Sequence, residues 1–337
     1  MTARAAATLA LGALLLAGPA NAQSSPTEPP RTDLGSIWTV RIENDRISTQ
    51  PRGSDQNYTS GVQLVWTSGP DQVPEAATRI AHFLLGDGTV RVGVALSHQF
   101  YTPANTALRT PDPRDRPYAG YVAATFSIMQ DSGNSRDLLA LSLGVVGPSA
   151  FGRQIQNGYH NLIGVPISYG WGHQLRDEPA VELLAQHTWR LAIGRLGPIE
   201  FDTLPSVAMG VGTVRDYLQA AFVIRVGQGL DTDFGTARIR PGISGGDAFV
   251  AADGVAWYLF AGANGQAVLH DVFLDGNMFL RSPHVTRNPF LGELEAGLAI
   301  IWRGVRLSYV QTWQTEQFRH QRPGLFNFGS LALSTRF

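Results

Sequence analysis

Six polar residues in the first half of the chain have side chains that together can hydrolyse an ester. The set contains one imidazole, one carboxylate, two amides and two hydroxyls: His160, Asp45, Asn44, Gln156, Thr59 and Ser60. An imidazole titrates near neutral pH and can activate a water molecule, while an amide can donate to a developing oxyanion. A hydroxyl nucleophile activated by the histidine is the alternative. A hard cation such as Ca²⁺, held by the carboxylate, can polarise the ester carbonyl.

Taken singly, these residues also have ordinary explanations. A single histidine on a loop helix is usually a surface or packing residue, and Asn44-Asp45 at a strand end matches common turn chemistry. In Asp115-Arg116-Pro117-Tyr118, the guanidinium can form a rim salt bridge or contact a substrate phosphate. The Tyr118 ring can belong to an interfacial aromatic girdle or to a substrate site. The case for chemistry therefore depends on whether the fold brings the residues together.

Alternating apolar and polar residues predict β-strands through most of the chain. The predicted strands are 36–45, 57–67, 90–101, 119–130, 138–147, 180–192, 200–213, 216–227, 254–272, 292–302, 304–315 and 326–337. Segment 254–272 is either one strand or a hairpin broken at Asn264-Gly265. Because bacterial single-chain membrane barrels close with an even number of strands, we count it as one strand. The sequence thus predicts an all-β fold, a transmembrane antiparallel β-barrel of about 12 strands in a single domain over 23–337.

Strand order predicts that the polar groups meet at one rim. If both termini are periplasmic, odd strands run outward and the six residues fall at the outer ends of strands or in outer loops. The outer loop 148–179 has helical spacing from Ser149 to Ile163 and helix-stopping residues after it. Gln156 and His160 are one helical turn apart, so they should share one face of this helix.

Two of the predicted inner turns are longer than a hairpin needs. Segment 68–89 has a helical pattern from Pro74 to Leu85. Segment 228–253 is rich in Gly and Asp, and the sequence offers no reason for its length.

Both ends of the sequence carry export and assembly patterns. Residues 1–22 have an apolar run from Ala5 to Ala17 followed by Ala20-Asn21-Ala22, which predicts a cleaved signal peptide. The run is too short to cross a bilayer as a helix. The final alternating segment ends in Phe337, and we expect the barrel-assembly machinery to recognise this strand.

Composition narrows the possible functions. A hydrophobic content of 44% with a mean hydropathy of −0.05 fits strands that alternate lipid-facing and lumen-facing residues. The net charge of −1 argues against a nucleic-acid partner. Cysteine is absent, so disulfides and thiolate sites are excluded. All 26 basic residues are arginine, which suits phosphate recognition but also fits a codon preference.

Several motifs, in order along the chain, resemble those of the LpxR-type lipid A 3′-O-deacylase family. They are Glu43-Asn44-Asp45, Asn57-Tyr58-Thr59-Ser60-Gly61, Tyr101-Thr102-Pro103, Asp115-Arg116-Pro117-Tyr118-Ala119-Gly120, Leu143-Gly144-Val145-Val146-Gly147-Pro148, Gln156-Asn157-x-x-His160, Gly170-Trp171-x-x-Gln174-Leu175-x-x-Glu178-Pro179, Phe260-Ala261-Gly262 and Phe273-Leu274-Asp275-Gly276-Asn277. The resemblance covers essentially the whole chain after residue 22. It implies a barrel with its active site outside, between the wall and a helix from an outer loop.

The resemblance also implies an activity, namely Ca²⁺-dependent hydrolysis of the ester that holds the 3′ acyloxyacyl group of lipid A. In that case His160 would be the base that activates water, and Asp45 with Asn44 would serve the cation and the oxyanion. Thr59 or Ser60 would position substrate or water, and Gln156 would support the base. Arg116 and Tyr118 would contact the lipid. The expected partner is lipopolysaccharide in the outer membrane, bound by a monomer whose site faces the cell exterior.

Two other functions remain open at the level of sequence. One is an outer-membrane phospholipase that uses Ser60 or Thr59 as a nucleophile with His160. The other is a non-enzymatic channel or adhesin, in which the loop helix is a plug. A barrel of this size with a crowded lumen should conduct poorly, which places the channel last.

Overall fold

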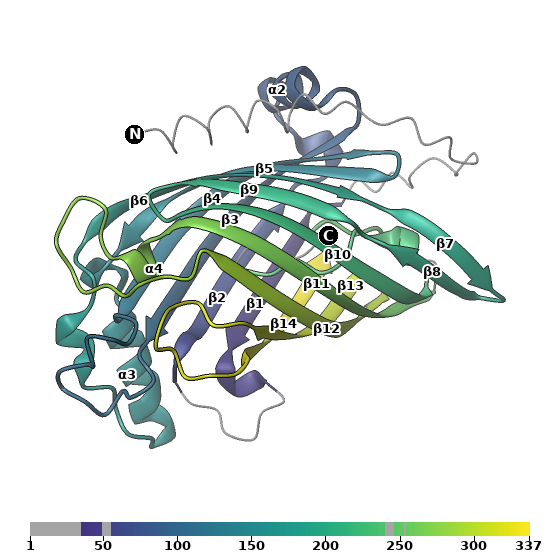
Figure 1. Ribbon diagram of the computed structural model, residues 1–337. Helices are drawn as coiled ribbons and strands as arrows, with labels where there is room; N and C mark the ends of the chain where they lie inside the picture. The colour runs from purple at the N-terminus through teal and green to yellow at the C-terminus, as the bar shows by residue number, and fades with distance from the viewer. Residues whose placement is uncertain (1–34, 49–54, 240–245, 253) are drawn as a thin grey trace.

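The computed structural model describes residues 35–48, 55–239, 246–252 and 254–337, which form a closed antiparallel β-barrel (Figure 1). The predicted signal peptide, 1–22, lies outside the described residues. The strands are β1 (Ile37–Asn44), β2 (Asn57–Thr67), β3 (Thr89–Thr102), β4 (Ala119–Ser132), β5 (Ser135–Val146), β6 (Glu178–Trp189), β7 (Leu191–Leu196), β8 (Ile199–Thr203), β9 (Ser206–Gly212), β10 (Arg215–Gln228), β11 (Val255–Asp271), β12 (Phe290–Trp302), β13 (Val305–Gln314) and β14 (Phe326–Arg336).

The barrel closes because β1 pairs antiparallel with both β2 and β14. Arg190 alone separates β6 from β7, and Leu204-Pro205 separates β8 from β9. β6 pairs with β9, and β7 pairs with β8. Therefore β6 and β7 together form one interrupted wall strand, and β8 and β9 together form the next. The wall therefore has twelve strands, as predicted. Among the described strands, closure pairs the wall on both sides, and a short edge remains along β7, which pairs with β8 alone.

The ambiguous segment 254–272 forms one strand. β11 runs from Val255 to Asp271 without a break, and Asn264 and Gly265 pair in register with both β10 and β12. A hairpin at Asn264-Gly265 would have left both neighbouring strands without a partner along half their length. Pairing with β10 and β12 therefore keeps the segment as one strand, although Asn264-Gly265 is a local turn signal.

The predicted inner turn at 193–199 was too long. β7 continues to Leu196 and β8 begins at Ile199, so the turn itself is only Gly197-Pro198. Gly197 has a φ of 59°, the left-handed conformation that a two-residue hairpin turn requires. All of β7 is exposed, and the hairpin extends past the wall in Figure 1.

Side chains alternate between the two sides of the wall. In β1, Trp38, Val40 and Ile42 are exposed on the outside, while Thr39 and Arg41 are buried inside. This order inverts that of a soluble domain, because the interior is polar and the outer surface is apolar. The alternation is the pattern of a barrel that faces lipid.

The long segment between β10 and β11, left unexplained by the sequence, contributes charged side chains to the lumen. Asp233 is fully buried and lies 2.7 Å from Arg225 Nη1 and 3.2 Å from Arg306 Nη1. Arg238 lies 3.5 Å from the carboxylates of Glu293 and of its neighbour on β12, Glu295. Buried charges need partners of opposite sign, and these pairs supply them while filling the barrel.

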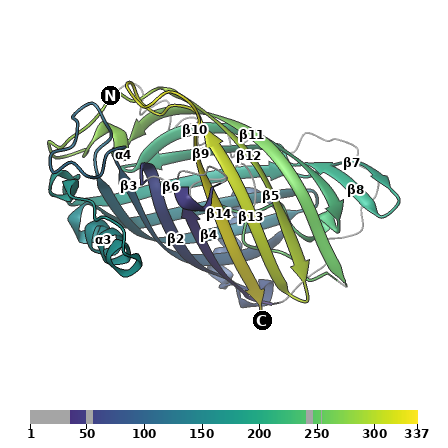
Figure 2. The same cartoon turned by 90° about the horizontal axis from the view of Figure 1, so that it is seen from below.

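The helices lie at the two ends of the barrel. They are η1 (Asp45–Ile47), η2 (Pro70–Gln72), α2 (Glu75–Leu85), η3 (Pro148–Ala150), α3 (Gly152–Ile163), η4 (Gly170–His173), η5 (Leu230–Thr232) and α4 (Val272–Asp275). Figures 1 and 2 place α3 and α4 at one end and the end of β14 at the other. Both predicted helices are confirmed, as α2 and α3. Within the described ranges, no helix is long and apolar enough to cross a membrane.

Candidate active site

The ends of β1 and β2 bring the first two polar groups together at the rim that carries α3. Asn44 is paired with Ser60 across the two strands, so these two of the six predicted residues meet at the rim. The Asn44 side chain accepts a hydrogen bond of 2.7 Å from the Arg46 backbone and so caps η1. This cap turns the chain away from the barrel, and Asp45 is buried at the start of the turn.

A β-bulge at Thr59 brings two hydroxyl-bearing residues onto the outside of the wall. Tyr58 pairs with Tyr101 and Ser60 with Phe100, so Thr59 is the extra residue. The hydroxyls of Thr59 and Thr102 are 2.7 Å apart. By strand alternation Thr102 and Phe100 lie on the outer face, and Thr59 therefore faces outward as Ser60 does. The bulge explains why the sequence could not assign one of the two hydroxyls to the site.

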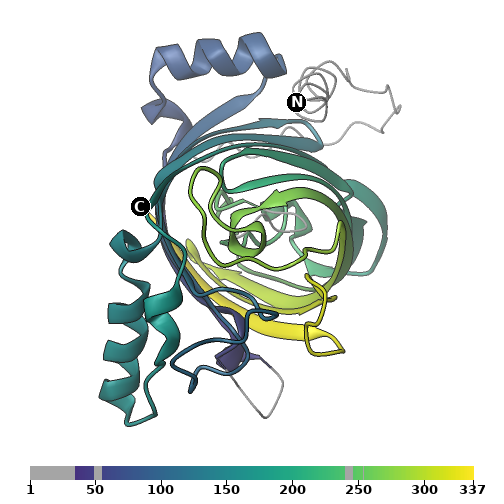
Figure 3. The same cartoon turned by 60° about the vertical axis from the view of Figure 1, so that its left-hand side comes forward.

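Helix α3 lies against the outer side of the wall, close to β4 (Figure 3). Its buried face consists of Gly152, Gln156 and His160, one turn apart, which confirms that the amide and the imidazole share a face. Gly152 permits the close approach, because a Cβ there would lie 2.6 Å from the Trp171 ring. Gly164, with a φ of 70°, ends the helix and donates to the His160 carbonyl.

His160 is held at both ring nitrogens. Nδ1 lies 2.7 Å from the Pro166 carbonyl oxygen, and because a carbonyl only accepts, this nitrogen carries a proton. Nε2 lies 2.9 Å from Oδ2 of Asp55, and the two form an ion pair when the imidazole is protonated. The Pro166 contact thus fixes the ring orientation and leaves Nε2 as the nitrogen that exchanges a proton.

Asp55 is the site residue that sequence reasoning missed. It lies in the connection between β1 and β2, two residues before the strand motif that begins at Asn57. The Thr102 hydroxyl donates to the Asp55 backbone carbonyl at 2.9 Å, which ties this residue to the end of β3. Sequence spacing linked Asp55 to neither β3 nor the helix, because the partners lie 47 and 105 residues further along the chain.

Asp45 is electrostatically unusual. It is 3% exposed, and burial raises the pKa of its carboxyl to about 8, with the nearby Asp55 carboxylate adding to the shift. One oxygen, Oδ2, accepts from the Gln56 backbone at 3.2 Å. The other oxygen, Oδ1, is buried and has no hydrogen-bond partner among the described residues. Such an oxygen is costly to bury unless a proton or a cation satisfies it.

Gln156 also has an unsatisfied group. Its Oε1 accepts from the Trp171 indole at 2.7 Å, whereas its Nε2 is buried without a hydrogen-bond partner in the described part of the chain. The indole bond fixes which end of the amide donates. Gln156 therefore presents a fixed N–H donor close to the base, since His160 follows it by one turn on the buried face.

Tyr118 packs beneath α3. Its ring lies 4.8 Å from that of Trp171, which also contacts Phe100, and together these three form a small buried cluster. Tyr118 is fully buried, and burial raises the pKa of its hydroxyl to about 12. The residue thus supports the helix, and its predicted contact with substrate stays a prediction.

Arg116 lies on the other side of the wall. Its guanidinium packs over the Tyr101 ring at 4.8 Å and donates to Gln317 at 3.0 Å. Tyr101 alternates with Phe100 and lines the lumen, so Arg116 is buried at the mouth of the barrel rather than beside His160. The structure does not bring Arg116 to the other site residues, and its role toward substrate remains a prediction.

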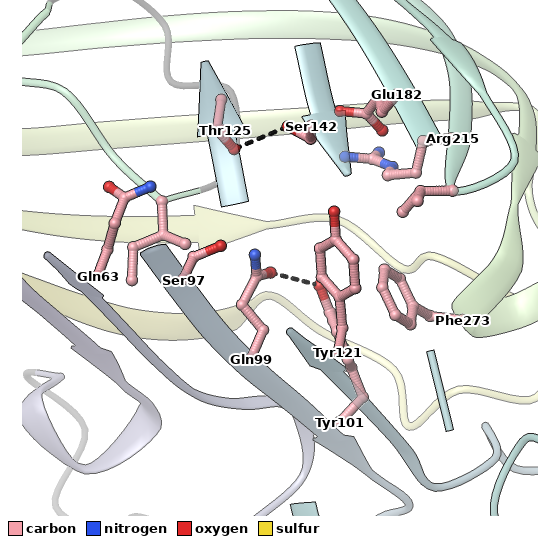
Figure 4. A pocket seen from close by; sticks show the side chains of 12 residues that line it. Gln63, Ser97, Gln99, Tyr101, Tyr121, Thr125, Ser142, Glu182, Arg215 and Phe273 are labelled. Atoms are coloured by element: carbon pink, nitrogen blue, oxygen red, sulfur yellow. Dashed lines mark hydrogen bonds between the residues drawn. The ribbon is translucent and has the colours of Figure 1, made fainter. Parts of the chain in front are cut away.

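A cavity of about 60 Å³ lies inside the barrel (Figure 4). It is lined by Gln63, Ser97, Gln99, Tyr101, Tyr121, Thr125, Ser142, Glu182, Val214, Arg215, Ile239 and Phe273. The six residues that the sequence singled out for chemistry are not among its lining residues. The candidate site is thus on the outer wall and separate from this cavity.

The residues at the rim suit a hard cation. Ca²⁺ binds oxygen atoms from carboxylates, amides and backbone carbonyls. Asp45 offers a buried carboxylate oxygen without a partner, and the neighbouring Asp55 adds a second negative charge. No group of three or more histidine, aspartate and glutamate side chains that could hold a metal ion occurs in the described ranges. A cation here would therefore also use amide, backbone or water oxygens.

Comparison with known proteins identifies the family. The family model described as "Outer membrane protein LpxR" matches residues 9–337. LpxR from Salmonella typhimurium has a similar structure, with a TM-score of 0.73, 18% identity and coverage of 89% of this chain and 100% of that one. The β domain of the Bordetella autotransporter Brka is less similar, with a TM-score of 0.43, 9% identity and coverage of 90% and 99%. No curated protein matches the sequence. The chain therefore belongs to the LpxR outer membrane protein family.

Proposed function

We propose that this outer-membrane barrel is a lipid A deacylase that hydrolyses the ester of the 3′ acyloxyacyl group. The observation that supports this most strongly is the group formed by His160, Asp55, Asp45 and Gln156 on the outside of the wall, next to the lipid-facing surface. A base, a cation site and an N–H donor are the components that ester hydrolysis requires. Membership of the LpxR family supports lipid A as the substrate.

In this mechanism His160 activates water. Its Nδ1 proton is held by the Pro166 carbonyl, so Nε2 takes the proton from the attacking water. Because the Asp55 carboxylate occupies Nε2 at 2.9 Å in this structure, the attacking water must take its place there, and the displaced carboxylate, still close by, balances the charge of the imidazolium that forms. His160 then returns the proton to the sugar oxygen as the ester bond breaks. The free N–H of Gln156 is placed to donate to the substrate carbonyl.

We further propose that Ca²⁺ binds at Asp45, with Asn44 contributing its side chain and Asp55 its charge. When bound, the cation would supply positive charge next to the ester carbonyl. Its binding also removes the electrostatic penalty of Asp45, since a divalent cation balances two neighbouring carboxylates. Arg116 and Tyr118 enter the proposal as residues that shape the substrate region, the first from the mouth of the barrel and the second from beneath α3.

The structure favours water over a protein nucleophile. The Thr59 hydroxyl bonds to Thr102, and Nε2 of His160 faces a carboxylate rather than a hydroxyl. A phospholipase that uses Ser60 or Thr59 as nucleophile would need the histidine next to that oxygen. Labelling by a serine-directed covalent inhibitor would support the phospholipase, whereas a protein that stays unlabelled while it deacylates would support activated water.

The test is mass spectrometry of lipid A from a host with fully acylated lipid A that expresses the chain. We expect the loss of one acyloxyacyl group, abolished by a Ca²⁺ chelator. The variant His160→Ala should lower deacylation by roughly 10²–10⁴-fold, the usual contribution of a general base. His82→Ala, on the exposed face of α2, is the matched control and should leave it unchanged. Unaltered lipid A from folded, surface-exposed protein would refute the proposal and favour a channel or adhesin.

Two features of assembly complete the proposal. Because the wall closes on itself through β1 and β14, we expect a monomer to suffice for the site. We also expect the barrel-assembly machinery to recognise β14 together with Phe337, which follows the strand directly and is 75% exposed.

A further inference from the structure

Helix α2 lies against the lipid side of the barrel wall, at the end where β1 begins and β14 ends, which we call the terminal end of the barrel. The Gln130 side chain on β4 donates to the backbone carbonyls of Leu85 and Gly86, at 3.3 and 3.0 Å. Gln130 pairs with Val90 on β3, and both side chains are buried. Figure 3 shows the helix beside the wall rather than over the lumen.

Strand alternation shows that this attachment is on the outer face. Counting in twos from Val90 and Gln130 along β3 and β4 leads to Val94 and Phe126, which pair with each other. These two side chains are 42% and 49% exposed, and they belong to the apolar belt that faces lipid. The C-terminal end of α2 therefore covers the outer face of β3 and β4 at Val90 and Gln130, four residues along each strand from this exposed belt.

The helix has three distinct faces. Ala81 is fully buried and contacts the barrel side. Ile80, Phe83 and Leu84, spaced as neighbours on one helical face, are 50%, 86% and 37% exposed. We call these three residues the α2 stripe. Glu75 and His82, seven residues apart and both exposed, lie on the remaining face, whereas Arg79, which pairs with Glu75 at 3.9 Å, lies at the edge of the stripe one turn before Phe83. The polar face is readily solvated by water, whereas exposing the apolar side chains of the stripe to water is unfavourable in free energy.

The position of α2 identifies what covers the stripe. Trp38 pairs with Trp66, and Trp66 pairs with Val94, so a row of aromatic and apolar side chains on the outer face leads to the helix. Tryptophan concentrates at membrane–water interfaces. A short helix next to this row, with an apolar stripe between a polar face and a protein face, matches an interfacial helix.

We propose that α2 is an interfacial anchor, whose stripe inserts among the acyl chains of the leaflet at the terminal end of the barrel. Its polar face stays in the headgroup region, and its buried face holds it to β3 and β4. The anchor fixes how deep the barrel sits and how it is tilted at that end. This inference rests on the barrel geometry and is independent of the proposed enzymatic function.

The absence of cysteine from the sequence permits a direct test with single introduced cysteines. A bimane probe is attached at Phe83→Cys, at Glu75→Cys as the aqueous control, and at Leu96→Cys, which is 59% exposed on β3, as the lipid control. The folded protein is placed in phosphatidylcholine vesicles that contain lipids brominated at different depths. The Phe83 probe should be quenched best by shallow bromines, roughly 5–10 Å into the headgroup and acyl boundary. The Leu96 probe should be quenched as well, and the Glu75 probe by aqueous iodide instead.

Two results would overturn the proposal. Quenching of the Phe83 probe by iodide to the same extent as the Glu75 probe, without quenching by brominated lipid, would place the stripe in water. A disulfide-linked dimer of unlabelled Phe83→Cys protein, formed in vesicles but absent for Glu75→Cys, would assign the stripe to a second copy of the chain.

A second pair of variants guards against a local effect of the probe. With the probe at Leu84→Cys, the additional change Phe83→Asp should reduce quenching by brominated lipid, because a charge in the stripe opposes insertion. The additional change His82→Asp on the polar face should leave that quenching unchanged. Equal effects of the two changes would contradict an anchor that inserts through its stripe.

Discussion

The proposed binding of Ca²⁺ at the rim should weaken steeply as the pH falls below about 8. Burial and the neighbouring Asp55 carboxylate raise the pKa of Asp45 to about 8, so near neutral pH this carboxyl holds a proton. A cation binds the ionised form and must displace that proton. Below the raised pKa, each pH unit should therefore weaken the apparent affinity about tenfold, because the ionised fraction falls tenfold. A carboxyl with the ordinary pKa of 3.8 would give the same affinity at pH 7 and 9.

Isothermal titration calorimetry of the folded barrel in detergent, at about pH 7, 8 and 9, measures this effect. Repeating each titration in two buffers of different ionisation enthalpy gives the number of protons released. We expect about one proton released per Ca²⁺ at pH 7 and almost none at pH 9. Asp45→Asn should bind Ca²⁺ more weakly and without the pH dependence.

Two results would refute this reasoning in different ways. An affinity of the unmodified protein that is constant from pH 7 to 9 would show that Asp45 is ionised throughout, and that burial does not raise its pKa. If Asp45→Asn bound Ca²⁺ as tightly as the unmodified protein, Asp45 would not be a ligand. In that case the unpartnered Oδ1 would need another explanation.

The remaining predictions concern packing and stability. Gly152→Leu should separate α3 from the wall and lower deacylation at least tenfold, whereas Gly158→Leu, with open space around it, should not; equal losses would contradict the packing argument. Thr59→Val should lower activity about fivefold, because it breaks the hydrogen bond to Thr102, and Thr102→Val should lower it further, because it also removes the bond to the Asp55 carbonyl; a larger loss at Thr59 than at Thr102 would indicate direct contact of Thr59 with substrate. Asp233→Ala should destabilise the barrel by about 3–5 kcal/mol in urea titrations followed by gel mobility, since it leaves two buried guanidinium groups without their shared carboxylate; an unchanged midpoint would contradict that role.

Much of the architecture followed from local pattern. The alternation of apolar and polar residues predicted the wall strands, and β2 begins and ends where it was expected. The helical spacing in 148–179 predicted that Gln156 and His160 share a face, and α3 confirms this. These features depend on neighbours within a few residues, because side-chain direction repeats every two residues in a strand and every 3.6 in a helix.

The sequence by itself determined the fold class, the closure into an even number of strands and the chemical inventory at the rim. Only the tertiary structure decided which groups meet. It placed Asp55 beside His160, although 105 residues separate them, and it put Arg116 inside the mouth of the barrel. It also showed the segment after β10 filling the lumen with paired charges. The physical reason is that these contacts join segments that are distant in the sequence, and strand pairing and bulges set the register that brings them together. The local sequence around one residue does not specify which distant residue becomes its partner.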